Sequence, residues 1–129
     1  KIKYIEEWVK RRNVAADTYT NFLSEIDEIT LPLTDVRCDH TFHLYVIKTD
    51  QRDNLQSYLK NKGISSGIHY PRALPELDCY KYLNLDLSKY SNAISNCSSI
   101  LSLPIYPEIT VDQIKFVASN IKDFFSKEL

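Results

Sequence analysis

The chain has 129 residues, 43% of them hydrophobic, which is enough for one compact core and too little for two domains. A formal net charge of −1, with sixteen Lys and Arg spread along the chain, excludes the basic surface of a nucleic-acid-binding protein. No run of about 18 apolar residues is present, so no membrane-spanning helix is predicted. The three cysteines have no patterned spacing, which indicates a reducing compartment, the cytoplasm, rather than a disulfide framework.

The first residues predict a long amphipathic helix. From Ile2 to about Ile26, apolar side chains recur at steps of three, four or seven, with polar side chains on the opposite face. Such a helix in a small domain is typical of a bridge to another domain or subunit; packing on its own core is an equal alternative for its second half. Because the chain starts at Lys1 inside this pattern and contains no methionine, we expect it to be cut from a longer protein.

Two strands and a helix are predicted next. The β-branched and aromatic run Phe42–Ile47 is typical of a strand. Asp50 is a good N-cap for the helix that follows, and Gly63 is placed to end it, because glycine tolerates the left-handed conformation found beyond a helix. Ile100–Pro104 is predicted as a short, buried strand.

The remaining elements are predicted to be helical. Leu77–Leu83 is typical of a short helical turn, and Ser88–Ser99 carries apolar residues at helical spacing, with Cys97 expected as a buried, inert thiol. Thr110 and Gln113 occupy the positions of a capping box, and an amphipathic pattern follows them. The chain is therefore predicted to end in a helix.

The segment Gly63–Pro71 holds both glycines of the chain, four residues apart. Glycine is favoured where the backbone takes a positive φ or where another group approaches closely, so Gly67 is expected to mark a second special backbone position. The residues between alternate as a third strand would, and the final proline ends it because proline has no N–H for a ladder. His69 and Tyr70 at the exit of this strand are predicted to present two polar rings to a site.

Together these elements predict an α/β (α+β) fold in which a small three-stranded sheet packs with about four helices. The helices include a long N-terminal helix and a C-terminal helix. One domain is expected over residues 1–129, with the long linking helix at residues 1–28 and the α/β layer at residues 29–129.

Other chemistry has little support in the sequence. Cys38, His40 and His43 crowd into six residues but lack the paired spacing of zinc ligands, so no metal site is predicted. No cysteine nucleophile and no pair of carboxylates can be named from spacing. His69 is the stronger candidate for a binding role, the competing interpretation being a ring that only closes the core. Arg72 is a candidate for pairing with an anionic ligand, the alternative being a solvated side chain.

An ordered series of motifs carries a family resemblance. The series runs His43–Ile47, Arg52 with Leu55, Leu59 with Gly63-Ile64, Gly67-Ile68-His69-Tyr70-Pro71, Tyr80, and Leu101-Ser102-Leu103-Pro104-Ile105-Tyr106-Pro107. It resembles the C-terminal segment of the nucleotide-sugar aminotransferases, the DegT-type branch of the fold-type I pyridoxal-phosphate enzymes. The opening pattern, Ile2–Arg12, is similar to the helix that links the large and small domains of that family.

The resemblance implies an enzyme about three times as long as this chain. It would transfer an amino group, usually from glutamate, to a nucleotide-linked keto-sugar, with pyridoxal 5′-phosphate bound mainly by the large domain. Family members are homodimers, act in polysaccharide or lipopolysaccharide biosynthesis, and keep their Schiff-base lysine in the large domain. This chain would therefore hold no catalytic residue and would be inactive alone. It would supply substrate-binding residues, for which the resemblance and the local sequence nominate His69, Tyr70, Arg72 and Gly67.

One departure from the family pattern bears on specificity. After the His-Tyr-Pro motif, members often continue with a proline, a second histidine and a glutamine, whereas this chain has Arg72–Cys79 in their place. A different sugar or nucleotide is one consequence that this allows. Two other readings of the whole chain stay open: a stand-alone, non-catalytic binding module of the same fold, and the small domain of another fold-type I enzyme.

Overall fold

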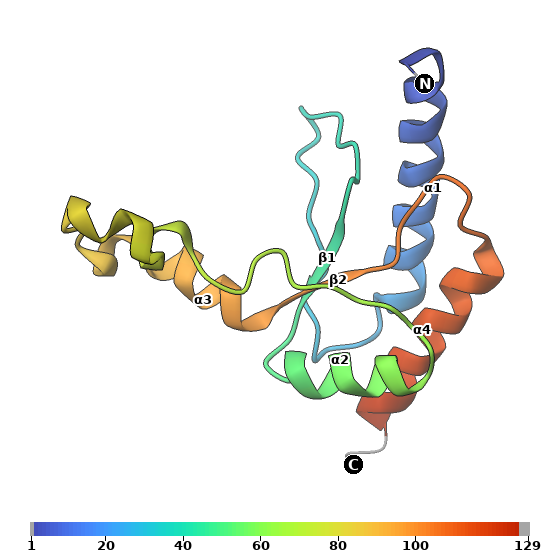
Figure 1. The fold of residues 1–129 in the computed structure, drawn as a ribbon. Helices are drawn as coiled ribbons and strands as arrows, with labels where there is room; N and C mark the ends of the chain where they lie inside the picture. Colours follow the sequence, from blue (N-terminus) through green and yellow to red (C-terminus); the bar gives the residue numbers. More distant parts are fainter. Residues whose placement is uncertain (1, 127–129) are drawn as a thin grey trace.

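The chain, described over residues 2–126 by a computed structural model, is a mixed α/β structure (Figure 1). In chain order its elements are η1 (Ile2–Tyr4), α1 (Ile5–Leu23), β1 (Tyr45–Lys48), α2 (Arg52–Asn61), η2 (Leu74–Glu76), η3 (Asp78–Leu83), η4 (Leu87–Tyr90), α3 (Ser91–Ser99), β2 (Ile100–Leu103) and α4 (Val111–Ser126), where η denotes a 3-10 helix. The predicted fold class, the long N-terminal helix and the C-terminal helix are confirmed.

The sheet has two strands where three were predicted. β1 and β2 pair antiparallel, with Tyr45 opposite Leu103. The expected third strand makes only an isolated bridge, between Gly67 and Ser102. The segment is bounded on both sides of this bridge, because the Ile64 N–H turns back to the Leu59 carbonyl at the end of α2 and Pro71 has no N–H to continue a ladder.

Gly63 ends α2 as predicted, with a φ of +75°. Its N–H donates to the Lys60 carbonyl at 3.0 Å, and the Ile64 N–H donates to the Leu59 carbonyl at 2.9 Å, which together make a Schellman motif. Ile64 and Leu59 are both buried in the hydrophobic core, as is typical of the apolar residues that flank this motif. The predicted cap at the other end is wrong: Gln51, and not Asp50, precedes the first residue of α2, and it makes no side-chain cap.

One hydrophobic core is built from α1, α2, α4 and the sheet. Its largest fully buried side chains are Tyr19, Leu23, Tyr45, Ile47, Leu55, Leu59, Leu101, Ile114 and Ile121. The rings of Tyr19 and Tyr45 stack with centroids 5.0 Å apart, and the Tyr19 hydroxyl donates to the Pro104 carbonyl at 2.8 Å. Burial raises the pKa of both phenols. Burying a hydroxyl is tolerated here because each phenol has a hydrogen-bond partner, Thr20 in the case of Tyr45.

Helix α1 is buried only in its second half. Residues of α1 become buried only from Ala15 onward, while Ile5 and Val14 on its first half stay exposed.

At the start of α4 the predicted capping box is confirmed: the Gln113 N–H donates to Thr110 Oγ1 at 3.2 Å, and the Thr110 N–H donates to Gln113 Oε1 at 2.9 Å. Within residues 2–126, no helix has the length and apolarity needed to cross a membrane.

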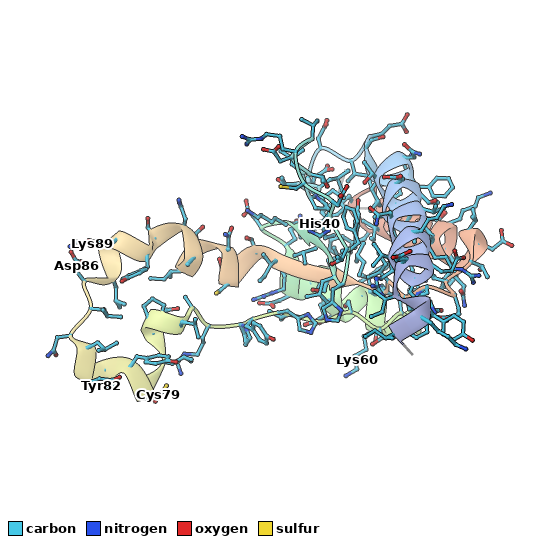
Figure 2. The ribbon with its side chains drawn as sticks, turned by 90° about the horizontal axis from the view of Figure 1, so that it is seen from above. His40, Lys60, Cys79, Tyr82, Asp86 and Lys89 are labelled. Atoms are coloured by element: carbon cyan, nitrogen blue, oxygen red, sulfur yellow. The ribbon has the colours of Figure 1, made fainter. Side chains whose placement is uncertain are left out.

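A segment of the chain projects away from this core. We call residues 74–99, which form η2, η3, η4 and α3, the projecting segment; the yellow and light-orange part of Figure 1 extends to one side of the sheet. Figure 2 shows Cys79, Tyr82, Asp86 and Lys89 on this segment, well separated from Lys60 and His40. Among these described residues none is buried.

Candidate functional site

The candidate site forms where the segment after Gly63 runs beside β2. Gly67 exchanges two backbone hydrogen bonds with Ser102, at 3.0 Å and 2.7 Å. This pairing places the end of the segment, including His69, along the edge of β2 that does not pair with β1. A Cβ built on Gly67 would lie 2.7 Å from Cε1 of His69, closer than such contacts occur. Gly67 is therefore needed for the close approach of an imidazole, which agrees with the close approach expected from the sequence.

His69 is held by contacts on two sides. Its Nδ1 lies 2.9 Å from Oγ of Ser102. Its ring meets the Tyr70 ring edge-on, with centroids 5.8 Å apart and an interplanar angle of 83°. Nε2 of His69 makes no hydrogen bond within residues 2–126. His69 is exposed, so the interpretation that its ring only closes the core does not describe this structure.

A hollow of about 220 Å³ opens beside this histidine. It is lined by His43, Leu44, Ser65, Ser66, Gly67, His69, Ser102, Leu103, Pro104 and Ile105. No Lys, Arg, Asp or Glu is among these residues. The hollow thus offers imidazole, hydroxyl and backbone groups, which suit a neutral, oxygen-rich ligand group better than an ionic one.

Tyr70 and Arg72 lie outside this lining. Tyr70 is 72% exposed and adjoins the hollow only through its edge contact with His69. Arg72 is exposed, and its Nη2 donates to the Glu76 carbonyl at 2.5 Å. The Glu76 carboxylate in turn accepts a hydrogen bond from the Ala73 N–H at 3.1 Å, so this loop is stabilised by hydrogen bonds between its own residues. Of the four nominated residues, the structure brings together Gly67, His69 and Tyr70 and leaves Arg72 beyond them.

Ser102 and His43 are residues of the hollow that the sequence analysis did not nominate for the site. Ser102 is 4% exposed and lies in the middle of β2, between Leu101 and Leu103. A lone polar residue inside a buried apolar strand was the available signal, because a buried hydroxyl needs a partner. His43 gave no comparable signal, since its place beside the hollow depends on how β1 pairs with β2.

The remaining histidine and the cysteines take no part in the hollow. His40 Nδ1 accepts a hydrogen bond from the Phe42 N–H at 2.9 Å, and its ring packs on the Phe42 ring. Cys38 and Cys79 are exposed, whereas Cys97 is half-buried rather than fully buried as predicted, because no residue of α3 reaches the core. In the part of the chain that the structure describes, no three His, Cys, Asp or Glu side chains are grouped to hold a metal ion.

Known proteins resemble this chain in sequence and in structure. The DegT/DnrJ/EryC1/StrS aminotransferase family matches residues 1–122. The erythromycin biosynthesis sensory transduction protein EryC1 of Saccharopolyspora erythraea is 32% identical over 122 residues, which are 95% of this chain and 33% of that protein. The dTDP-3-amino-3,4,6-trideoxy-alpha-D-glucose transaminase of Streptomyces venezuelae is 28% identical over 96% of this chain and 33% of its own length.

The structural likeness agrees. The crystal structure of DesV from S. venezuelae, in complex with a ketimine intermediate, superposes with a TM-score of 0.88 at 27% identity, covering 95% of this chain and 33% of DesV. The chain thus spans about a third of the length of the relatives that it matches. From the match over nearly all of its residues, this chain belongs to the DegT/DnrJ/EryC1/StrS aminotransferase family.

Proposed function

We propose that this chain is the C-terminal part of a pyridoxal-phosphate-dependent aminotransferase that transfers an amino group, from glutamate, to a nucleotide-linked keto-sugar. The observation that carries the proposal is the hollow bordered by His69, which no Lys, Arg, Asp or Glu lines. Nε2 of His69 has no hydrogen bond within residues 2–126. The names of the relatives favour the same substrate class, since they include transaminases of dTDP-linked and UDP-linked sugars. A sugar presents hydroxyl and carbonyl oxygens, and these match imidazole and phenol groups.

In this proposal His69 and Tyr70 orient the sugar, and Gly67 leaves the space that the His69 ring occupies. Arg72 lies farther along the same loop, exposed, where a guanidinium is suited to the phosphates of a nucleotide. These are binding roles, because none of these groups is assigned a bond-making step. The departure from the family pattern after Pro71 bears on which sugar and nucleotide are accepted.

The cofactor does not fit the hollow. A phosphate ester needs cationic side chains or several converging N–H donors, and the lining has no Lys or Arg. We assign no Schiff-base role to any lysine of this chain and derive no step through the cofactor here. Pyridoxal phosphate, when bound, supplies the electron sink of the reaction, and under this proposal the rest of the enzyme holds it.

The test uses the full-length polypeptide that contains this chain, supplied with pyridoxal phosphate, glutamate and dTDP- or UDP-linked keto-sugars. We expect amino-sugar product, and we expect His69→Ala to lower kcat/KM by about tenfold, through the loss of an oriented hydrogen bond, while the far-UV circular dichroism is unchanged. Arg37→Ala is the matched control, because Arg37 is an exposed residue whose ion pair is with the nearby Asp35. No product with any such acceptor would overturn the proposal, and unchanged kinetics in His69→Ala would remove His69 from the site.

One observation favours a second candidate, a non-catalytic regulatory or binding protein of the same fold. Two relatives at 32% and 31% identity are named as a sensory transduction protein and a pleiotropic regulatory protein. Under this alternative the full-length polypeptide would bind a nucleotide-sugar without converting it. The same assay, paired with calorimetric binding of the keto-sugar, separates the two candidates.

The proposed enzyme is a cytoplasmic homodimer. Its dimer is supported by the projecting segment, whose exposed apolar side chains, among them Tyr82 and Leu83, are covered by nothing in residues 2–126. Sedimentation of the full-length polypeptide at micromolar concentration checks this: we expect twice the monomer mass. A monomer would contradict the assembly without affecting the substrate class.

A further inference from the structure

The backbone of Ser102 is held in place by hydrogen-bonded neighbours on both sides. Ser102 is 4% exposed, lies in β2 and pairs with Val46 of β1, and it also exchanges both backbone hydrogen bonds with Gly67 on its other side. Its backbone is therefore held between β1 and the segment that contains Gly67. A hydroxyl on such a backbone has a well-defined position, and the only hydrogen bond of Oγ within residues 2–126 is the one with Nδ1 of His69, at 2.9 Å.

The direction of this hydrogen bond follows from what each group can do. A serine hydroxyl has one donor and two acceptor sites, and a neutral imidazole has one nitrogen that donates and one that accepts. If Nδ1 carried the proton, the Ser102 hydroxyl, in a residue that is 4% exposed, would have no acceptor within residues 2–126 for its own hydrogen. Leaving a nearly buried donor without a hydrogen bond is costly. If the hydroxyl donates to Nδ1, both groups are satisfied and the ring proton resides on Nε2.

We propose that Ser102 is a positioning residue that holds His69 in the Nε2–H tautomer, so that the imidazole donates a hydrogen bond to an oxygen of the ligand in the hollow. Gly67 contributes because it has no Cβ, which leaves the space that the His69 ring occupies beside Ser102. Tyr70 limits the ring from another side through its edge contact. The identity of the ligand oxygen, a sugar hydroxyl or carbonyl, rests on the proposed function, whereas the tautomer does not.

The tautomer is measured directly by ring ¹⁵N chemical shifts in the 129-residue chain labelled with ¹⁵N-histidine. Only three histidines are present, and His69→Gln assigns the signal of interest. In the signals of the neutral ring, we expect an unprotonated Nδ1 and a protonated Nε2 for His69. A protonated Nδ1 in the wild-type chain would overturn the proposal, whatever happens to any variant.

Variants then test whether Ser102 is the cause. Ser102→Ala is expected to convert the single tautomer into a mixture, and Gly67→Ala is expected to do the same by displacing the ring. Ser99→Ala is the matched control, because Ser99 is the last residue of α3, three positions before Ser102, and its hydroxyl donates to the carbonyls of Ser95 and Asn96 rather than to His69. It should leave the shifts unchanged. An unchanged tautomer in folded Ser102→Ala would refute the role of Ser102.

Kinetics in the full-length polypeptide give an independent readout. Ser102→Ala is expected to lower kcat/KM for the keto-sugar by about fivefold to tenfold, the loss of one oriented hydrogen bond, and Ser99→Ala to leave it unchanged. An unchanged kcat/KM in Ser102→Ala would show that the tautomer has no function. If the wild-type polypeptide formed no amino-sugar, the proposed function would fail while the ¹⁵N shifts would still decide the tautomer.

Discussion

The core region and the projecting segment of this chain are stabilised in different ways. The core region, which consists of α1, β1, α2, β2 and α4, buries a continuous set of apolar side chains, several of them completely. The projecting segment is just as regular in its backbone, yet none of its described residues is buried. Regular secondary structure is thus present in both regions, while hydrophobic stabilisation is concentrated in one.

Local hydrogen bonds account for the regularity of the projecting segment. Asp86 caps η4 by accepting from the N–H and the hydroxyl of Ser88, and Asn84 ends η3 with a left-handed φ of +47°. The segment is tied to the core region at its end, where Arg52 of α2 donates to the Cys97 carbonyl at 3.2 Å. The comparison teaches that short-range signals are sufficient to shape a segment, and that burial decides how stable it is.

The largest expected difference is in amide hydrogen exchange. Amides of α4 should exchange through global unfolding, whereas those of η3 and α3 should exchange through local opening, faster by orders of magnitude. Exchange followed by mass spectrometry on the 129-residue chain measures this contrast. Equal protection in both regions would mean that the segment is covered, for example by a second copy of the chain.

Side-chain truncation should separate the two regions next. Ile121 is fully buried in α4, and Ile121→Ala should lower the free energy of unfolding by about 2–5 kcal/mol through lost burial and a cavity. The matched substitution in the projecting segment is Leu83→Ala, at a leucine that is 48% exposed, and it should change stability by less than about 0.5 kcal/mol. Urea denaturation measures both. Comparable losses would contradict the division into two regions.

In both regions a residue with a positive φ ends a helix, and substitutions at these two residues give a test with a smaller expected effect. Gly63 in the core region and Asn84 in the projecting segment both have a positive φ. Gly63→Ala should lower the free energy of unfolding by about 1 kcal/mol, a cost of conformation alone, since a Cβ there would meet nothing within 4 Å. Asn84→Ala should loosen only the end of η3, with little effect on the global transition.

Gly63→Asn is the control for this pair, because asparagine tolerates the left-handed conformation better than alanine. Its loss of stability should be smaller than that of Gly63→Ala. Equal losses for the two substitutions would show that space, and not the left-handed backbone, sets the cost.

The smallest expected effect concerns surface charges. In the core region, Lys122 Nζ lies 2.9 Å from Glu25 Oε2, and this hydrogen bond lowers the pKa of the Glu25 carboxyl. A carboxyl whose pKa is lowered by folding stabilises the fold above its unfolded pKa, and this contribution is lost as pH falls through the folded pKa. Glu25→Gln should therefore be slightly less stable than the wild type at neutral pH, and equally stable at acidic pH.

The corresponding pair in the projecting segment is Asp78 with Lys81, both exposed and 3.0 Å apart. Asp78→Asn should leave the global unfolding transition unchanged at any pH, because that part of the chain contributes no buried contact to it. A pH-dependent loss in Asp78→Asn as large as that in Glu25→Gln would show that the two regions unfold together.

The sequence by itself determined the elements that rest on local rules. The amphipathic stripes of α1 and α4, the left-handed glycine that ends α2 and the capping box at Thr110 each depend on residues within a few positions of one another. Interactions between residues close in the sequence are sufficient to form these elements, so the residue types predict them. The ordered motifs likewise pointed to the family that matches residues 1–122.

Only the tertiary structure decided the rest, because it depends on which distant segments meet. That the segment after Gly63 contributes one bridge rather than a third strand, and that Ser102 receives the His69 ring, are outcomes of pairing between positions more than thirty residues apart. The absence of buried residues in the projecting segment is of the same kind, since its helical sequence pattern does not say what lies beside it. Burial and long-range pairing are properties of the assembled chain, and no local pattern encodes them.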